Sequence, residues 1–388
     1  MGALRIGLAL ALLLALLYHY KARKRRAALF QDLRPALAEG SERTKSVATV
    51  HYEVRLRLQE ELYKGSVRCS FVMRRQGELR LDFQGKTITD FRVNHQRREP
   101  QWTSPTSISL SPLKLGFNEV EIRFLGLYSD TGLSSSPDLV LFPGAVQGLH
   151  RVFPCFDQPD IKATCRLIVS ALRGWEVLST DFPQRLTNYV GCCPDPDPIF
   201  DEEERQPSTL HEFHPSVPYS PDHFAVCAGK FTRFTLQKQQ RLTVLCRPQL
   251  APSLNLSLHF TTLEQALSHM HELTGVPYCF PKLDVVYVPR TTGYAASVVF
   301  VNEELGRIDW GGEEELRETL ARQVAAQWVG VLLTYESSAD QPAWSSLRDV
   351  LADDFLGREC LDEARRAVLQ ARFSLHKWDS CAAATLYS

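Results

Sequence analysis

Histidine and cysteine side chains are the first candidates for metal binding or nucleophilic catalysis, and the sequence contains 11 histidines and 10 cysteines. The cysteines are scattered without a CxxC pair, so they indicate neither a structural zinc site nor a disulfide framework. His211 and His214 lie in a proline-bounded segment, and His269 and His271 point to different faces of an expected helix. We interpret these histidines as solvent-exposed or capping groups. The sequence also lacks a GxSxG nucleophile motif and a phosphate-binding loop.

Three stretches carry motifs that can be recognised by their letters. They read FPCFDQPDIKAT at residues 153–164, PKLDVVYVP at 281–289 with GYAAS at 293–297, and RQVAAQWVG at 322–330. In this order they resemble the FPCFDEP…KATF segment, the PKLD…VP strand with its GAMEN exopeptidase motif, and the HExxHQWFG helix of the aminopeptidase N family of zinc metallopeptidases. The resemblance extends roughly over residues 45–360. It implies a β-sandwich domain followed by the front part of a thermolysin-like domain.

The resemblance also shows which functional groups have been replaced. A zinc peptidase needs two imidazoles one helical turn apart, a carboxylate as third ligand and a position open to water. Arg322 stands at the first histidine position, Ala326 at the second and Gln323 at the general-base glutamate. A guanidinium offers no lone pair, a methyl group has no donor atom, and an amide cannot take up a proton. Ala296 stands where the family's glutamate binds the α-amine of a substrate.

The third zinc ligand is replaced as well. Its position falls on Ser345, or on Leu347 if Trp344 is the matched tryptophan, and neither residue is a carboxylate. Nearby acids are interpreted as surface or helix N-terminal charges and not as displaced ligands; they are Asp349, Asp353 and Asp354. The sequence therefore predicts no catalytic residue, no metal ligand and no bound cofactor, although zinc is expected for the family.

Trp328, Gly330 and residues 153–159 resemble framework positions of the family, which implies that the fold still forms and that a cleft remains between the two domains. Such a cleft is a common place for a ligand. Arg322 in this cleft is expected to form a salt bridge with a neighbouring acid such as Glu303 or Glu304. The candidate residues of the binding cleft are Gly293, Tyr294, Ala295, Ala296, Ser297, Arg322, Gln323 and Trp328.

The N-terminus carries the one strong local charge asymmetry. Residues 6–18 read IGLALALLLALLY without a charge, and five basic residues follow between positions 21 and 26. This pattern predicts an uncleaved, single-pass signal-anchor, and the basic excess after it places the globular part in the cytosol. The sequence leaves open whether the membrane is the endoplasmic reticulum or the mitochondrial outer membrane.

The pattern of apolar residues changes along the chain. Alternation at 51–58, 66–73, 78–83 and 118–124 predicts antiparallel strands, with more strands at 163–171 and 224–244. Apolar residues then recur at helical spacing over 256–273, and further helices are expected at 313–333 and 345–373, with short strands at 283–288 and 298–301. The segment 192–207 is expected to be an exposed, solvated loop. The predicted class is α+β, with an anchor and linker at 1–44, an antiparallel β domain at 45–248 and a partial, mostly helical peptidase-like domain at 249–388.

The balance of charge limits the possible partners. The net charge is −1, which gives no reason to expect nucleic-acid binding. The leading hypothesis is a catalytically inactive, membrane-anchored aminopeptidase-like protein that binds, or acts as a scaffold for, a protein or peptide partner. Two alternatives stay open: a zinc aminopeptidase that cleaves N-terminal residues from peptides, and a truncated product with little function of its own.

Overall fold

The computed structural model describes residues 42–144, 148–200, 204–237, 241–306, 312–335 and 340–358. The chain divides into two units, Met1–Ser46 and Val47–Ser388, and every strand and helix named below belongs to the second. The expected membrane segment at 6–18 lies outside the described residues. Within the described ranges no helix has the length and apolar character needed to span a bilayer. The predicted mixed α+β class is confirmed.

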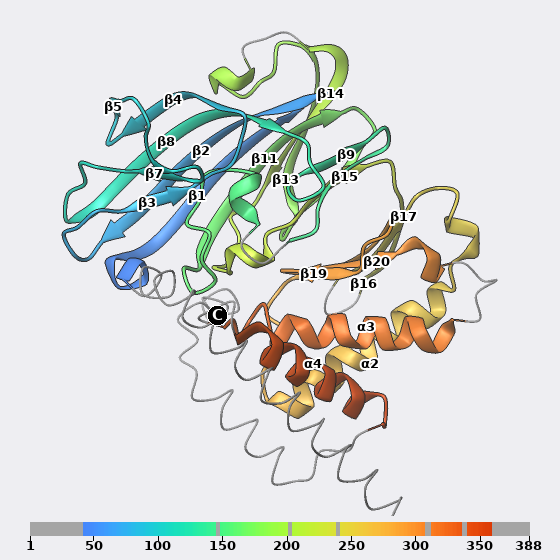
Figure 1. Ribbon diagram of the computed structural model, residues 1–388. Helices are drawn as coiled ribbons and strands as arrows, with labels where there is room; N and C mark the ends of the chain where they lie inside the picture. Colours follow the sequence, from blue (N-terminus) through green and yellow to red (C-terminus); the bar gives the residue numbers. More distant parts are fainter. Residues whose placement is uncertain are drawn as a thin grey trace, which may run out of the picture. The chain divides into compact units, whose positions relative to one another are not determined.

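An eight-stranded sheet forms the first layer of the β-rich part, in the order β13-β14-β11-β1-β2-β8-β4-β5 (Figure 1). Inward-facing residues are buried and alternate with more exposed ones along its long central strands, as expected for a sheet with one covered face. Its strands are β1 (Val47–Leu58), β2 (Leu62–Met73), β4 (Thr87–Val93), β5 (Gln96–Arg97), β8 (Gly116–Leu127), β11 (Ala163–Leu172), β13 (Pro183–Gly191) and β14 (Glu204–Phe213).

The prediction of a wholly antiparallel sheet is wrong at one pair of strands. β1 and β11 run parallel, with Val50 opposite Ala163. Parallel neighbours need a long crossover connection, which the chain between residues 58 and 163 supplies. Periodicity within a strand reports its covered face but carries no information about the direction of its neighbour.

A four-stranded sheet forms the second layer, in the order β12-β15-β10-β9. Both of its faces are covered. Val140 and Phe142 point into the core shared with the eight-stranded sheet, whereas Leu139 and Leu141 belong to a second cluster on the opposite face. Its strands are β9 (Ser134–Ser136), β10 (Leu139–Phe142), β12 (Glu176–Leu178) and β15 (Val226–Gly229), and a separate three-stranded sheet comprises β3 (Arg80–Asp82), β6 (Gln101–Ser104) and β7 (Ser107–Ser109).

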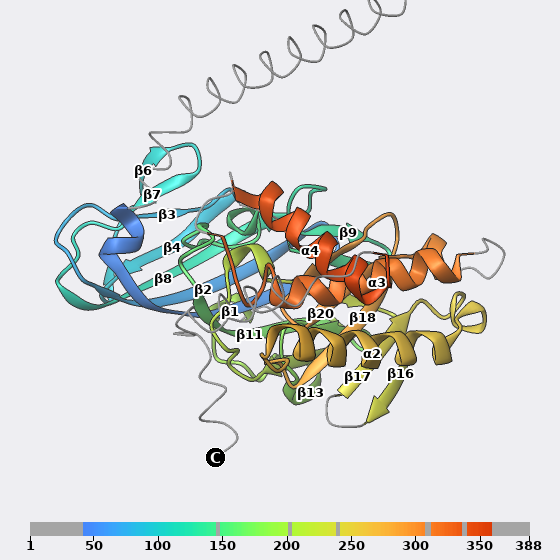
Figure 2. The same ribbon diagram turned by 90° about the horizontal axis from the view of Figure 1, so that it is seen from below.

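A five-stranded sheet and three helices complete the molecule's described part. The sheet order is β16-β17-β18-β20-β19, and β17, β18 and β20 run parallel, with helix α2 in the crossover between the first two. The helices cover one face of this sheet (Figures 1 and 2). The elements are β16 (Thr232–Gln237), β17 (Arg241–Cys246), β18 (Lys282–Val288), β19 (Gly293–Ala295), β20 (Val298–Asn302), α2 (Leu256–Thr274), α3 (Glu313–Trp328) and α4 (Gln341–Phe355).

Helix ends follow from local residues in two of the three helices. Asn255 caps α2 by accepting a hydrogen bond from the Leu258 N–H, and Gly275 ends it in the left-handed conformation. α3 ends five residues earlier than predicted, because Gly330 has a φ of +146° that no helix contains. α4 ends at Phe355, and residues 356–358 after it are described but not helical, so the predicted helix over 345–373 is wrong in that stretch. Residues 359–373 lie outside the described residues.

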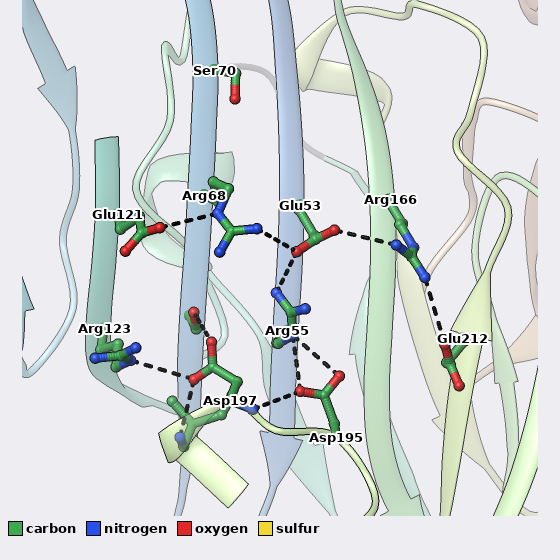
Figure 3. A network of polar contacts seen from close by, with 12 residues as sticks. Glu53, Arg55, Arg68, Ser70, Glu121, Arg123, Arg166, Asp195, Asp197 and Glu212 are labelled. Carbon is green, nitrogen blue, oxygen red and sulfur yellow. Dashed lines mark hydrogen bonds and ion pairs between the residues drawn. The ribbon is translucent and has the colours of Figure 1, made fainter. Parts of the chain in front are cut away.

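The segment 192–207, predicted as an exposed, solvated loop, is so only in part, because residues 204–207 belong to β14 and residues 192–200 include both exposed and covered positions. Figure 3 shows Asp195 and Asp197 pointing at arginines on the outer face of the eight-stranded sheet. Asp195 accepts two hydrogen bonds from Arg55 Nε, at 3.1 and 3.2 Å, and Asp197 accepts one from Ser66 Oγ at 2.9 Å. The following Ile199 and Phe200 are buried. The loop is therefore attached to the sheet by both ion pairs and apolar packing.

Candidate functional site

Helix α3 carries the positions at which the sequence predicted a lost metal site. Three glutamates in its first turn, from Glu313 to Glu315, stabilise the helix because their negative charges lie at the positive end of the helix dipole. The helix buries Leu320 and Val324 against the five-stranded sheet and α2. This packing places Arg322 and Ala326 one turn apart, as two metal-binding imidazoles would need to be.

Arg322 is held by carboxylates from two helices. Its Nη2 donates to Glu318 Oε1 at 2.9 Å, its Nη1 donates to Asp349 on α4, and an oxygen of Asp353 lies 3.7 Å away. The expected salt bridge to Glu303 or Glu304 is wrong, because Glu303 pairs with Arg247 at 2.6 Å. Arg322 therefore joins α3 to α4.

Asp354 on α4 is not the surface charge that the sequence predicted, whereas the Asp349 side chain is 48% exposed. Asp354 is buried, and its side chain pairs with His269 Nε2 at 3.1 Å. Asp349 and Asp353 surround Arg322. These acids pair with basic side chains on other helices, His269 on α2 and Arg322 on α3. The spacing of the acids along α4 does not reveal which helices lie next to it.

The other two replaced positions on α3 face the interior. Ala326 is buried, and its carbonyl oxygen accepts a hydrogen bond from the Val331 N–H at 3.1 Å. Gln323 is partly exposed, but its buried amide oxygen has no hydrogen-bond partner among the described residues. Neither side chain offers a group that could take up a proton at neutral pH.

Tyr294 on edge strand β19 fills the space next to the end of α3. Its ring packs against the His223 ring, with centroids 5.3 Å apart, and the guanidinium of Arg348 lies 4.8 Å from the Tyr294 ring centre and donates to its hydroxyl. A Cβ at Gly330 would lie only 2.8 Å from Tyr294 Oη. Burial raises the pKa of Tyr294, and Arg348 opposes this increase. The phenol is therefore neutral near pH 7.

Two residues of a short 3₁₀ turn, Pro221–His223, complete this cluster. Asp222 is buried and accepts a hydrogen bond from the Tyr335 hydroxyl at 2.7 Å. Burial lowers the pKa of His223 to about 3, and the nearby cations Lys162 and Arg348 act in the same direction. Its Nε2 has no hydrogen-bond partner among the described residues. The cluster thus contains a neutral imidazole, a carboxylate and an arginine at one place.

The strand that follows Tyr294 is fixed to α3 by the side chain of Gln327. Gln327 donates to the Ala295 carbonyl and accepts from the Ser297 N–H, each at 3.0 Å. The Ala296 N–H donates to the His223 carbonyl at 3.0 Å. Trp328 donates from its indole to the Val276 carbonyl at 2.9 Å. These contacts place the GYAAS strand beside the end of α3.

The structure brings part of the predicted cleft set together. Four of the eight residues are partly exposed, namely Gly293, Tyr294, Arg322 and Gln323, and four are buried, namely Ala295, Ala296, Ser297 and Trp328. The buried four serve packing and backbone hydrogen bonds. Whether the set forms a ligand cleft stays a prediction.

Sequence reasoning missed the other members of the cluster around Tyr294, which are Lys162, Asp222, His223, Tyr335 and Arg348. Lys162 lies inside the FPCFDQPDIKAT stretch, so that motif contained a signal for it, whereas Asp222 and His223 lie in none of the three stretches. Arg348 and Tyr335 lie in no motif. Their roles depend on the path of the chain after Gly330.

Similarity in sequence to known proteins identifies a related family. No protein-family model matches the chain. It is similar to an aminopeptidase N of Streptomyces lividans (27% identical over 202 residues), an aminopeptidase N of Plutella xylostella (27% over 144 residues) and aminopeptidase M1 of Arabidopsis thaliana (24% over 241 residues). These matches cover 49%, 36% and 58% of this chain.

The same matches cover only 21%, 14% and 25% of the three relatives, so the chain spans about a quarter or less of their length. They support a relationship of the chain to the aminopeptidase N family, which confirms the resemblance seen in the motifs. The activity of those longer proteins does not follow for this chain from partial similarity.

Proposed function

We propose that the protein is a catalytically inactive relative of the zinc aminopeptidases and that it binds, or acts as a scaffold for, a protein or peptide partner. The observation that carries this proposal is on α3, where Arg322 and Ala326 stand one turn apart at the positions of two metal ligands. A guanidinium paired with Glu318 and a buried methyl group do not fit a zinc ion. Gln323 cannot act as a general base.

The packing around Tyr294 supports the same proposal. An aminopeptidase must hold the free amine of a substrate with an acidic group, and Ala296 supplies none. Arg348 brings a positive charge to the Tyr294 ring, which disfavours a second cation nearby. Arg348 would repel the ammonium group that an aminopeptidase needs to bind, and the nearby Asp222 carboxylate already accepts a hydrogen bond from the Tyr335 hydroxyl.

Zinc content and peptidase activity can both be measured on the purified full-length chain. We expect substoichiometric zinc by elemental analysis after exposure to zinc and dialysis, and no release of coumarin from aminoacyl-coumarin substrates. The triple variant R322H/Q323E/A326H is the matched comparison, and it should gain zinc because two imidazoles one turn apart are restored. Stoichiometric zinc with turnover in the unmodified chain would establish the alternative, a zinc aminopeptidase, and end the proposal.

The domain organisation of the chain would follow that of the family. Residues 45–248 would correspond to the family's N-terminal β domain and 249–388 to the front part of its thermolysin-like domain.

Residues 6–18 would anchor the protein in the endoplasmic reticulum or mitochondrial outer membrane, with the globular part in the cytosol. Alkaline extraction of membranes tests the anchor, because release of the protein into the supernatant would contradict it. Protection from added protease in sealed membranes would contradict the orientation.

A further inference from the structure

A large cavity opens at one end of the β-rich part, between the eight-stranded and four-stranded sheets. Its volume is about 1070 Å³, and its walls come from the ends of β1, β11 and β14 and from β9 and β10. None of the residues of the candidate site on α3 and β19 lines it. Specific ligand pockets commonly have a volume between about 300 and 1,000 Å³, so this cavity can hold several residues of a peptide.

Two carboxylates stand at the mouth of this cavity. Glu60 and Glu61 form the tip of the turn between β1 and β2, and both are exposed. The turn is closed by a hydrogen bond from the Gln59 N–H to the Leu62 carbonyl, at 3.1 Å. Two adjacent acids on a closed turn create a negative potential that a cationic ligand would relieve.

Two aromatic side chains line the same cavity. The Tyr128 hydroxyl donates to the Gln59 carbonyl at 2.8 Å, which fixes its ring beside the acidic turn. Trp175 follows β11 and is partly exposed. Its backbone N–H donates a hydrogen bond to the Leu172 carbonyl at 3.1 Å. Aromatic faces attract cations and favour the flat guanidinium of arginine in particular.

Among the described residues that line the cavity, one side chain is cationic, and it does not change this preference. Arg57 is buried, with 1% of its surface exposed, and donates to the Ile199 carbonyl at 3.2 Å. Its positive charge therefore lies in the wall, whereas the two glutamates extend into solvent. A ligand that approaches from outside meets the carboxylates first.

The small sheet offers a backbone edge in the same place. β9 is the last strand in the order of its sheet, and Ser135 and Ser136 of β9 line the cavity. Both serines are exposed. An extended peptide can add to an edge strand through main-chain hydrogen bonds while its side chains enter neighbouring pockets.

We propose that this cavity binds an extended peptide segment of a partner protein and takes an arginine side chain of that segment between Glu60, Glu61, Tyr128 and Trp175. The carboxylates pair with the guanidinium, the aromatic rings contact its face, and β9 pairs with the peptide backbone. This binding site is separate from α3, so it can exist whether or not the protein has peptidase activity.

Binding of a fluorescein-labelled, end-capped peptide Gly-Ser-Val-Arg-Val-Ser-Gly to the full-length chain tests the proposal by fluorescence anisotropy. A peptide of the same sequence with citrulline in place of arginine has nearly the same shape but no charge. We expect the arginine peptide to bind about tenfold more tightly, because only its guanidinium is attracted by the carboxylates. No saturable binding, or equal binding of both peptides, would overturn the proposal.

Variants of the protein locate the binding. E60Q/E61Q and W175A should each weaken the arginine peptide about tenfold. The matched controls E99Q/E315Q and W102A change the same residue types at exposed positions outside the cavity and should leave the affinity unchanged. If W175A does not fold, E60Q/E61Q still decides the question, because both glutamates are exposed on a turn. Unchanged affinity in E60Q/E61Q would contradict the proposed site.

Discussion

At Gly330 two independent constraints act on one residue. Its φ of +146° is a conformation that residues with a side chain rarely adopt, and an added Cβ would lie 2.8 Å from Tyr294 Oη and 3.0 Å from the Ala326 carbonyl oxygen. The first constraint belongs to the Gly330 backbone, and the second to the Tyr294 side chain and the Ala326 carbonyl group. Gly330 thus allows α3 to end directly under Tyr294, and the two constraints can be separated by mutation.

We predict that G330A lowers the free energy of unfolding by about 2 kcal/mol, because the backbone is strained and Tyr294 must move. In a Y294A background both Tyr294 atoms that lie near the added methyl group, Oη and Cε2, are gone, so the cost of G330A should fall by roughly 1 kcal/mol. Urea denaturation of the four proteins of this cycle measures both values. G77A is the control, because Gly77 has open space around it and should tolerate a methyl group. Equal costs of G330A in both backgrounds would mean that Tyr294 does not lie against Gly330.

His211 shows how burial alone makes a histidine sensitive to acid. The sequence suggested a solvent-exposed or capping residue, but only 5% of its surface is exposed, and burial lowers its pKa to about 4 while Glu176 partly opposes this. The residue lies on the inner side of β14, opposite Val169 of β11. Its neutral form is therefore the one that the folded state accepts.

Because of His211, the free energy of unfolding should decrease as the pH is lowered. Between pH 6.5 and 4 the unfolded chain binds a proton at position 211 and the folded chain does not, so acid favours unfolding by up to about 3 kcal/mol. We predict that H211F reduces the loss of unfolding free energy over this pH range, as measured by urea denaturation at each pH. H271F is the control, because His271 is exposed on α2. An unchanged pH dependence in H211F would contradict the assigned burial.

At the scale of elements, the loop at 192–200 is held by partners far away in the sequence. Arg55 and Asp195 are 140 residues apart, and Arg123 donates to Asp197, 74 residues away, at 3.4 Å. These pairs continue an alternating row of acids and bases across the strands, which includes Glu53, Arg68, Glu121, Arg166 and Glu212 (Figure 3). The row gives the loop a fixed place on the sheet and keeps Phe200 out of solvent.

We predict that D195N/D197N frees this loop without unfolding the sheet. Chymotrypsin should cut after Phe200 about tenfold faster in the variant, because losing two partly buried ion pairs makes local opening easier by roughly 1.4 kcal/mol. Gel analysis of a time course, with mass spectrometry of the fragments, measures the rate at this bond. D130N serves as control, since Asp130 is exposed on another loop. Identical cleavage rates would show that apolar packing alone holds the loop.

The elements also show which part of the fold can be predicted from sequence. β1 and α2 were predicted to within a few residues, because each has a covered face whose period appears in the sequence and, for α2, a cap at each end. The end of α3 was missed because the apolar run continues to Leu333 past Gly330. The parallel pairing of β1 with β11 and the pairing of Arg322 with Asp349 join distant segments. Such contacts depend on the whole packing, so a local pattern cannot reveal them.

At the scale of the whole molecule, apolar clusters cross from the β-rich part into the part with the helices. Phe280, Ala296 and Val331 belong to the core of the large sheet. A second cluster joins Leu139 of the four-stranded sheet to Phe300 of the five-stranded sheet. Buried polar contacts lie at the same junction, since Lys162 donates to the Leu332 carbonyl at 2.8 Å. These two clusters are shared between the parts, whereas the cluster between the helices and the five-stranded sheet lies within one part.

Lys282 lies at this junction and allows its strength to be measured. Its ammonium group donates to the Ser179 carbonyl at 2.6 Å and pairs with Asp284, and each of the two residues has only 2% of its surface exposed. In K282M a buried carboxylate would remain without its cation, which costs about 3 kcal/mol or more. The variant should therefore be much less stable than the unmodified chain.

Because two of the apolar clusters are shared, we predict that residues 47–358 unfold in one cooperative transition and that K282M lowers its midpoint without splitting it. Differential scanning calorimetry measures the transition, and hydrogen exchange with mass spectrometry reports the two parts separately. The slowest amides of β2 and of α2 should have the same opening free energy and lose the same amount in K282M. K86M is the matched control, because Lys86 is exposed at the start of β4 and its loss should leave both values unchanged. Two transitions, or destabilisation of α2 with β2 unaffected, would show that the β-rich part is stable on its own and that the shared clusters contribute little.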